Sequence, residues 1–406
     1  MELLERFLQY VKIDTESIPD VEQYPSSEKQ KNLLSLLNEQ LNQMGVQSAM
    51  DNNYGYVYAT IPANTDCAYK LGFISHVDTS SAVSGKDVKP QITAGYDGGD
   101  IKLAEGRVLS PKDFPELLNS VGKTIISSDG TTLLGADDKA GVAVIMQMAQ
   151  TLVNNPQIKH GEIKIAFTPD EEVGRGTDFF DVTRFGADGA YTVDGGGLGE
   201  LEYENFNAAS AKVNVCGKSV HPGLAKGIMI NAALVAMELQ SLLPVEQNPA
   251  YTDGYEGFFY LESIRGECDS AQVNYIIRDH DHKKFQAKKD LFTKAVQYLN
   301  DKYGNGTVCA EITDSYYNMK EMVEPHIHLV ENAKTAMERV GVKPVVVPIR
   351  GGTDGARLSY EGLPCPNLFT GGHNFHGRYE YAVLEDVQKS LETVLQIVSI
   401  YADFKA

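Results

Sequence analysis

Cysteine is scarce in this chain of 406 residues, which contains only five. They are an odd number and include no C-x-x-C pair: Cys67, Cys216, Cys268, Cys309 and Cys365. Because disulfide frameworks and zinc ribbons need paired or closely spaced cysteines, the sequence argues against both. Unpaired cysteines are typical of a reducing compartment, so we expect a cytoplasmic protein.

Basic residues and long apolar runs are also few. Lys and Arg total 36 against 55 Asp and Glu, which gives a net charge of −19. Since nucleic acid and anionic lipid attract a basic face, we expect neither as a partner. No stretch reaches the ~18 continuous apolar residues of a membrane span. Residues 1–14 lack the basic and apolar segments of a secretory signal, which again favours a soluble cytoplasmic protein.

Helix-like and strand-like patterns alternate along most of the chain, which indicates an α/β domain with a sheet covered by helices. The length of the whole chain predicts two or three domains at roughly 150 residues each. Residues 208–320 instead follow the order strand, helix, strand, strand, helix, strand. That order is typical of a ferredoxin-like βαββαβ unit. We therefore expect an α/β domain made of residues 1–207 and 321–406, interrupted by a smaller domain of residues 208–320.

Candidate metal ligands follow expected strands, at the edge where open α/β sheets bind ligands. His76 and Asp78 end one apolar run, and Asp194 ends another. Asp137 and Asp138 open an expected helix, and Asp170, Glu171 and Glu172 follow a further strand. Much later, His376 lies in the glycine-rich segment 371–377, where the backbone can approach a site closely.

Each of these segments also has an ordinary structural explanation. A polar strand end accounts for His76 and Asp78, helix capping for Asp137 and Asp138, a solvated loop for the three adjacent acids, and a turn for Asp194. Together, however, they supply two histidines and at least three carboxylates at strand ends. That ligand set suits zinc or another divalent metal.

Three other catalytic patterns are missing. Gly217-Lys218-Ser219 lacks the earlier glycine of a phosphate-binding loop, because position 212 is Lys. Gly195 to Gly199 does not form the dinucleotide pattern G-x-G-x-x-G, and no G-x-S-x-G nucleophile elbow occurs.

The ordered motifs resemble the co-catalytic zinc exopeptidases, the family of aminoacylase and glutamate carboxypeptidase. The motifs are H-V-D-T (76–79), G-A-D-D-K-A-G (135–141), T-P-D-E-E-V-G (168–174), T-V-D-G-G (192–196), S-V-H-P-G (219–223), R-G-G-T-D-G (350–355) and N-F-H-G (374–377). The likeness runs through the whole chain, including segments 255–258 and 314–319. It implies a zinc-exopeptidase-like catalytic domain with a mixed sheet and helices on both faces, and a lid- or dimerisation-type insert.

The resemblance also implies roles for single residues and two Zn²⁺ per chain, with Mn²⁺ or Co²⁺ as substitutes. His76 and Asp194 would bind one ion, Glu172 and His376 the other, and Asp137 both. Asp78 would orient His76, and Glu171 would be the general base for a hydroxide bound by the two ions. His221 would help stabilise the carbonyl oxygen, and a group of polar side chains would hold the substrate C-terminus: Asn274, Arg278 and Arg350.

The implied activity is release of the N-terminal residue from tripeptides, with a small peptide as substrate and a possible homodimer through the insert. The core motifs are shared with dipeptidases, carboxypeptidases and N-acyl amino-acid deacylases, which remain alternatives. A non-catalytic binder on the same fold is a further alternative of another class. The intact ligand set argues against it.

Overall fold

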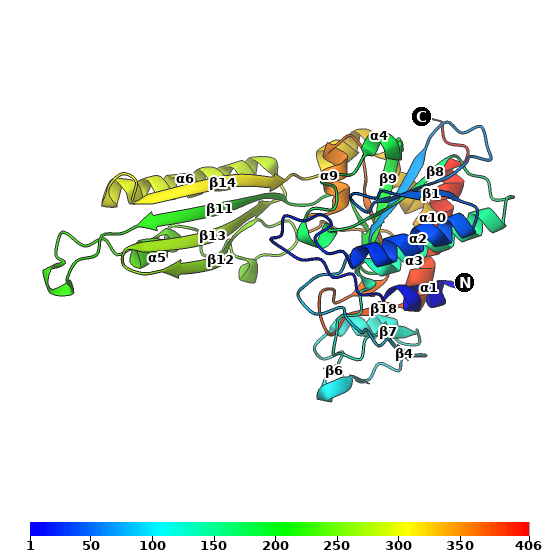
Figure 1. The fold of residues 1–406 in the computed structure, drawn as a ribbon, viewed down its shortest axis with the longest axis horizontal. Coiled ribbons are helices and arrows are strands. Elements are labelled where there is room, and N and C mark those ends of the chain that lie inside the picture. The colour runs from blue at the N-terminus through cyan, green and yellow to red at the C-terminus, as the bar shows by residue number, and fades with distance from the viewer. Residues whose placement is uncertain (406) are drawn as a thin grey trace. The chain divides into compact units, whose positions relative to one another are not determined.

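The computed structural model describes residues 1–405, which form two compact units (Figure 1). The larger unit comprises Met1–Tyr203, Glu321–Val347 and residues from Thr353 onward, and the inserted unit comprises Glu204–Lys320 and Pro348–Gly352. The predicted boundaries place residues 348–352 in the second part of the α/β domain, which is wrong. In the structure Ile349 N–H donates to the Glu204 carbonyl at 2.8 Å, which ties this short segment to the insert.

An eight-stranded mixed sheet forms the centre of the larger unit, as the fold class predicted. Its order is β1 (Gln47–Met50), β2 (Val57–Ile61), β8 (Ile163–Thr168), β3 (Leu71–His76), β9 (Gly189–Gly195), β16 (Asn367–Phe369), β10 (Glu200–Glu202) and β15 (Val345–Val346). β3 pairs in parallel with both β8 and β9. The carboxyl ends of these three strands therefore meet at one edge of the sheet.

Helices cover both faces of this sheet. On one face α3 (Ala136–Asn154) packs against β3 and β9, and on the other the shorter α4 (Val182–Phe185) and α9 (Asp354–Tyr360) pack against β8 and β9. The remaining helices associated with α3, directly or through one another, are α1 (Leu3–Tyr10), α2 (Gln30–Gln43), α8 (His328–Arg339) and α10 (Leu384–Tyr401). Figure 1 shows α1, α2, α3 and α10 gathered on the larger unit.

Gly141 explains how α3 approaches the sheet so closely. A Cβ atom at this position would lie 1.7 Å from the carbonyl oxygen of Val193 on β9 and 2.7 Å from the Ser75 hydroxyl on β3. Any larger side chain would therefore push the helix away. The close approach brings the first turn of α3, with Asp137, next to the ends of β3 and β9.

Residues 80–132 contain short strands that the sequence analysis did not anticipate. β4 (Gln91–Thr93) and β7 (Ile125–Ser127) join β17 (Gly372–His373) and β18 (Tyr381–Val383) in a four-stranded sheet, and β5 (Ile101–Lys102) pairs with β6 (Val108–Leu109). Strands of two or three residues are too short to show an alternating pattern. This second sheet supports the loop between β17 and β18, which carries His376.

The inserted unit has the βαββαβ order that the sequence predicts. Its elements are β11 (Asn207–Cys216), α5 (Ala232–Ser241), β12 (Phe258–Gly266), β13 (Ser270–Asp279), α6 (His282–Tyr303) and β14 (Val308–Tyr316). The short α7 (Lys320–Val323) follows, where the chain passes to the larger unit. All three strand pairs of the sheet are antiparallel, in the order β12-β13-β11-β14. The Asp281 carboxylate caps α6 by accepting the N–H of Lys284 at 2.8 Å.

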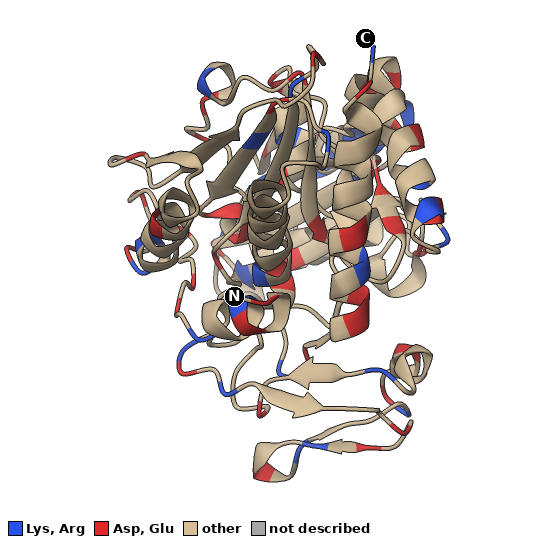
Figure 2. Cartoon of the chain, turned by 90° about the vertical axis from the view of Figure 1, so that its right-hand side faces the viewer, with Lys and Arg blue, Asp and Glu red and all other residues tan. Residues whose placement is uncertain are grey.

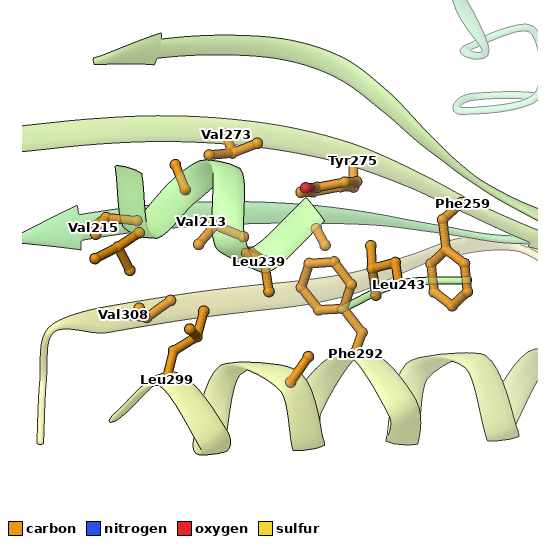
Figure 3. Packing of buried hydrophobic residues seen from close by; sticks show 14 of the residues in the cluster. Val213, Val215, Leu239, Leu243, Phe259, Val273, Tyr275, Phe292, Leu299 and Val308 are labelled. Carbon is orange, nitrogen blue, oxygen red and sulfur yellow. The ribbon is translucent and has the colours of Figure 1, made fainter. Parts of the chain in front are cut away.

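The insert has a hydrophobic core of its own, between one face of its sheet and helices α5 and α6 (Figure 3). Val273 and Tyr275 of β13 point into this core, as do Leu239 of α5 and Phe292 of α6. Because successive side chains of a strand point to opposite faces, Asn274 lies on the other, open face of the sheet. Asn274 there donates to the Ser263 hydroxyl at 2.9 Å.

The surplus of acidic residues is spread over the larger unit and not confined to one element. Figure 2 shows acidic and basic positions interspersed along its helices. Among the described residues, no helix is long and apolar enough to cross a membrane.

Candidate metal centre

Five potential ligands converge in the larger unit from five separate segments. His76 is the last residue of β3, Asp194 lies near the end of β9, and Asp137 lies in the first turn of α3. Glu172 belongs to a short 3₁₀ turn after β8 (Glu171–Val173), and His376 lies between β17 and β18. The family resemblance predicts these five residues as metal ligands, and the fold brings all five together.

Asp137 lies at the centre of this group. Its Oδ1 is 2.9 Å from Nε2 of His76, and its Oδ2 is 2.9 Å from Nε2 of His376. His76 Nε2 is also 3.3 Å from Oδ1 of Asp194, and His376 Nε2 is 3.0 Å from Oε2 of Glu172. The five side chains thus form two overlapping groups of three that share Asp137, with the ligand atoms of each group within 4.8 Å of one another.

The donor chemistry of these groups fits divalent metal ions. Each group offers one imidazole nitrogen and two carboxylates, a set that zinc and similar ions accept. Oε1 of Glu172 is buried and has no hydrogen-bond partner within residues 1–405. A buried oxygen without a partner is costly, and a cation beside it would satisfy it. The residues present therefore fit a metal cofactor.

The electrostatics of the group are those of a crowded acidic site. Burial raises the pKa of Asp194 to about 7 and that of Glu172 to about 7, and the nearby Asp137 carboxylate adds to both effects. Burial acts in the same direction on Asp137, but hydrogen bonds from the two histidines outweigh it and lower the pKa of this carboxyl. Hydrogen bonds from Asp137 and Glu172 raise the pKa of His376 to about 11. Positive charge is therefore strongly favoured among these side chains.

Asp78 links two of the converging strand ends. Its buried carboxylate lies 3.3 Å from Nδ1 of His76 and accepts the backbone N–H groups of Glu171 and Glu172 at 3.0 and 3.1 Å. A carboxylate on the second nitrogen of an imidazole fixes its tautomer and orientation. Asp78 thus contacts both His76 and the turn that carries the two glutamates, as a residue that orients them would.

Glu171 and Glu172 have different surroundings although they are adjacent in the chain. The Glu172 carboxylate faces His376, whereas the carboxylate of Glu171 has no hydrogen-bond or ion-pair partner in the part of the chain that the structure describes. Burial raises the pKa of Glu171 well above its ordinary value. An unpartnered carboxyl group next to a cluster of ligands is suited to proton transfer.

Several residues support the site in roles that were not predicted from the sequence. Asp170, the first acid of the 170–172 run, turns away and accepts hydrogen bonds from the Ser26 N–H at 2.6 Å and from the Gln30 amide at 2.7 Å. The Asn367 side chain accepts the N–H of Asp194 at 3.0 Å and donates to the half-buried Glu202 at 2.6 Å. Among these residues only Asp170 belongs to a motif that is visible in the sequence, the acidic run 170–172.

The four candidate substrate-binding residues all belong to the inserted unit. Arg278 lies on the open face of the sheet with its guanidinium 4.9 Å from the centre of the Tyr316 ring. The Glu262 carboxylate acts on its charge, but no residue in the described range 1–405 forms a hydrogen bond or ion pair with its guanidinium. His221 is exposed, and its Nδ1 accepts the N–H of Gly223 at 3.2 Å. Asn274 donates to Ser263, as described above.

Arg350 is in a different situation from Arg278. Its guanidinium donates to the carbonyl oxygens of Gly254 at 2.7 Å, Glu256 at 3.3 Å and Thr252 at 3.2 Å. It also lies 5.2 Å and 5.7 Å from the centres of two phenylalanine rings, Phe206 and Phe258. Its donors are thus used to hold the loop 252–256, whereas those of Arg278 are available for an anion.

Comparison with known proteins identifies relatives over the whole chain. The sequence model of Peptidase family M20/M25/M40 matches residues 132–399. Two relatives named Peptidase T are 56% identical over 405 residues, from Alkaliphilus oremlandii, and 55% identical over 400 residues, from Clostridium perfringens. The first match covers 98% of this chain and 99% of the relative, and the second covers 98% of both.

A solved structure with the same architecture is the aminopeptidase PepT from Bacillus cereus. It superimposes with a TM-score of 0.79 at 25% sequence identity, covering 99% of this chain and 98% of that one. The motif resemblance noted in the sequence is closest to peptidase T within its family, and these matches confirm it. With a family match over more than half of its length and relatives above 50% identity, the chain belongs to peptidase family M20/M25/M40.

Proposed function

We propose that this chain is an aminopeptidase that releases the N-terminal residue from tripeptides and uses two divalent metal ions. One observation carries the two-metal part of the proposal: the two carboxylate oxygens of Asp137 face two different histidines, His76 and His376. A shared carboxylate between two ligand groups is what a pair of neighbouring ions requires. The relatives named Peptidase T support the substrate class.

His76 and Asp194 would hold one ion, Glu172 and His376 the other, and Asp137 both. Zinc is the metal we expect, with manganese or cobalt as substitutes, because all three accept imidazole and carboxylate ligands. When bound, two such ions supply Lewis acidity, which polarises a peptide carbonyl and makes a water molecule more acidic. Asp78 keeps His76 and the glutamate turn in position throughout.

Glu171 is the proposed general base. Its unpartnered carboxylate takes a proton from the water molecule as the water oxygen forms a bond to the peptide carbonyl carbon. The same carboxyl group then returns the proton to the departing amine as the C–N bond breaks, so that Glu171 ends in its starting state. His221 is the proposed donor to the carbonyl oxygen, which becomes negative during this addition.

Recognition of the substrate C-terminus is assigned to the inserted unit. Arg278 is the strongest candidate because no described residue forms a hydrogen bond or ion pair with its guanidinium, and an arginine binds a carboxylate through two parallel hydrogen bonds. Asn274, on the same strand and the same face, is a weaker candidate. Arg350 would contribute through the loop 252–256, to which its donors are committed.

The experiment that tests this proposal combines metal analysis with a substrate panel. Purified full-length protein is analysed for metal content and then assayed on a tripeptide, the corresponding dipeptide and an N-acylated amino acid. We expect two divalent ions per chain, rapid cleavage of the tripeptide after its first residue, and loss of activity with a chelator. Preferred cleavage of the dipeptide or the acylated amino acid would favour the related dipeptidase, carboxypeptidase or deacylase activities instead.

Two further expectations accompany this proposal. If the purified protein contains no metal and shows no peptidase activity after metal is added, it is a non-catalytic binder. A homodimer through the inserted unit and a cytoplasmic location remain predictions, which sedimentation and cell fractionation would test.

A further inference from the structure

Glu380 is a buried carboxylate that makes three hydrogen bonds to a single turn of the backbone. Its Oε2 accepts the N–H groups of Leu134 at 2.7 Å and Gly135 at 2.8 Å, and its Oε1 accepts the N–H of Asp137 at 3.2 Å. Its side chain is 1% exposed. None of the roles proposed above uses this residue.

The backbone of the turn is shaped to receive such a carboxylate. Gly135 has a φ of +83°, a left-handed conformation that favours glycine. Alternation of left- and right-handed residues directs successive N–H groups to one side, where they bind an anion. Without Glu380, three N–H groups would be left unsatisfied at a buried position, among them that of Asp137.

Glu380 also closes the loop that carries His376. Its N–H donates to the Gly377 carbonyl at 3.3 Å, and the Asn374 side chain donates to the Tyr379 carbonyl at 3.1 Å. Next to Glu380, Tyr381 begins β18, which pairs with β7 and so anchors this end of the loop. The residue is therefore attached to two different segments of the candidate centre.

Glu380 connects the two ligands that face each other across one of the ligand groups. Asp137 lies two residues after Gly135 in the turn, and His376 precedes Glu380 by four residues in the loop. His376 Nε2 and Asp137 Oδ2 are 2.9 Å apart. A change in the contact between Glu380 and the turn would move one of these ligands relative to the other.

We propose that Glu380 is a positioning residue, which sets the spacing between Asp137 and His376 and thereby the metal affinity of the group Asp137, Glu172 and His376. The proposal rests on the proposed two-metal site. It extends that site by a residue that touches neither the substrate nor, in the proposed arrangement, an ion. Groups that orient metal ligands typically change metal affinity by about 10- to 100-fold when they are removed.

A purely structural role as a cap for α3 makes a different prediction. Loss of a cap lowers the stability of the fold but does not distinguish one ligand group from the other. In Glu380→Gln the amide oxygen can still accept two of the three backbone N–H groups. The amide NH₂ then faces the third N–H group, which it cannot accept. We expect this substitution to displace Asp137 while leaving most of the turn intact.

The test is a calorimetric titration of metal-free, full-length protein with Zn²⁺. Wild-type protein should bind two equivalents, and this stoichiometry tests the two-metal proposal separately. For Glu380→Gln we expect the equivalent bound by Asp137, Glu172 and His376 to lose about 10- to 100-fold in affinity, and the other equivalent to change much less. His376→Ala shows which of the two bound ions belongs to the Glu172 group, because the affinity of that ion should fall. In the double variant His376→Ala, Glu380→Gln, the affinity of that ion should fall little further.

Glu385→Gln is the matched control. The Glu385 carboxylate accepts the N–H of Thr124 at 2.8 Å and its hydroxyl at 3.0 Å, in the same unit but away from the turn of Asp137. We expect it to lower stability without changing either affinity. Unchanged affinities in Glu380→Gln, or an equal loss in both equivalents, would overturn the proposal.

A measurement on wild-type protein keeps the proposal testable if Glu380→Gln does not fold. Hydrogen exchange is followed by mass spectrometry with and without Zn²⁺ in segments 131–138 and 374–381. We expect both segments to gain protection at the same Zn²⁺ concentration, since Glu380 couples them. Protection of one segment without the other would contradict the coupling.

Discussion

Asp78 Oδ1 accepts the backbone N–H of Glu171 at 3.0 Å. Through the same carboxylate, Asp78 also lies 3.3 Å from His76 Nδ1. The residue therefore connects the end of β3 to the turn after β8, two segments that lie more than ninety residues apart in the chain. The positions of a proposed metal ligand and of the proposed general base depend on one side chain.

Substitution of Asp78 should consequently affect both functions. In Asp78→Ala the buried N–H groups of Glu171 and Glu172 lose their acceptor, and His76 loses its orienting partner. We expect metal affinity to fall about 10- to 100-fold and kcat to fall further, even at saturating metal. Steady-state kinetics across a Zn²⁺ series would separate the two effects. Full recovery of kcat at high Zn²⁺ would show that Asp78 affects metal binding alone.

Glu171→Gln should separate chemistry from metal binding. The amide has the same shape but cannot accept the proton of a water molecule, so we expect kcat to fall by about 10²- to 10⁴-fold. Metal content should stay at the wild-type value, because this carboxylate faces neither histidine. Glu338→Gln, on the exposed surface of α8, is the control and should leave kcat unchanged. Wild-type turnover by Glu171→Gln would remove Glu171 from the mechanism.

Much of this centre is predictable from the sequence, because the apolar runs before His76 and Asp194 identify buried strands whose ends meet at one edge. Residues of similar local appearance are harder to tell apart. Asp170, Glu171 and Glu172 form one acidic run, yet Asp170 turns to Ser26 and Gln30. No spacing rule distinguishes them, and only the family resemblance suggested their separate roles.

The supporting residues escape sequence reasoning for a different reason. Glu380 acts on a turn more than 240 residues earlier in the chain, and Glu202 acts through Asn367. Such contacts exist only after folding and leave no local pattern of charge or hydrophobicity. The short strands between residues 80 and 132 are missed because two or three residues are too few to show a period.

Loss of Arg278 and loss of Arg350 should have different effects on substrate binding. Arg278→Ala removes the unpaired guanidinium, so we expect KM for a tripeptide to rise by about 10- to 100-fold, corresponding to about 1.5–3 kcal/mol for a charged hydrogen bond. KM for the C-terminally amidated tripeptide should change little. Arg350→Ala should instead increase hydrogen exchange in the loop 252–256, which it holds. An equal rise in KM for both peptides in Arg278→Ala would argue against carboxylate recognition.

The core of the inserted unit offers a test of its stability. Phe292 on α6 is fully buried, and truncation of a buried phenylalanine typically costs about 3–5 kcal/mol. We expect Phe292→Ala to lower the free energy of unfolding by that amount in denaturant titrations. Tyr298→Ala on the same helix is the control, because this side chain is 50% exposed and should change stability by about 0.5 kcal/mol or less. Equal effects from the two substitutions would contradict the packing seen in Figure 3.

Glu202 should make stability depend on pH in a direction opposite to that of most carboxylates. Burial raises the pKa of this side chain to about 8. Because an unfolded glutamate titrates near 4.3, the folded protein holds a proton between about pH 4.3 and 8 that the unfolded chain has released. The free energy of unfolding therefore falls as pH rises through this window, by at most about 1.4 kcal/mol per pH unit for this group.

Glu202→Gln removes the titration and keeps an oxygen that can accept the Asn367 amide. We expect the substitution to be nearly neutral at pH 5 and to stabilise the metal-free protein progressively up to pH 8, by on the order of a few kcal/mol. Urea titrations at pH 5, 6.5 and 8 measure this difference, and Glu338→Gln provides the exposed comparison. A stability difference that stays constant over this range would mean that Glu202 is already ionised in the folded protein at pH 5.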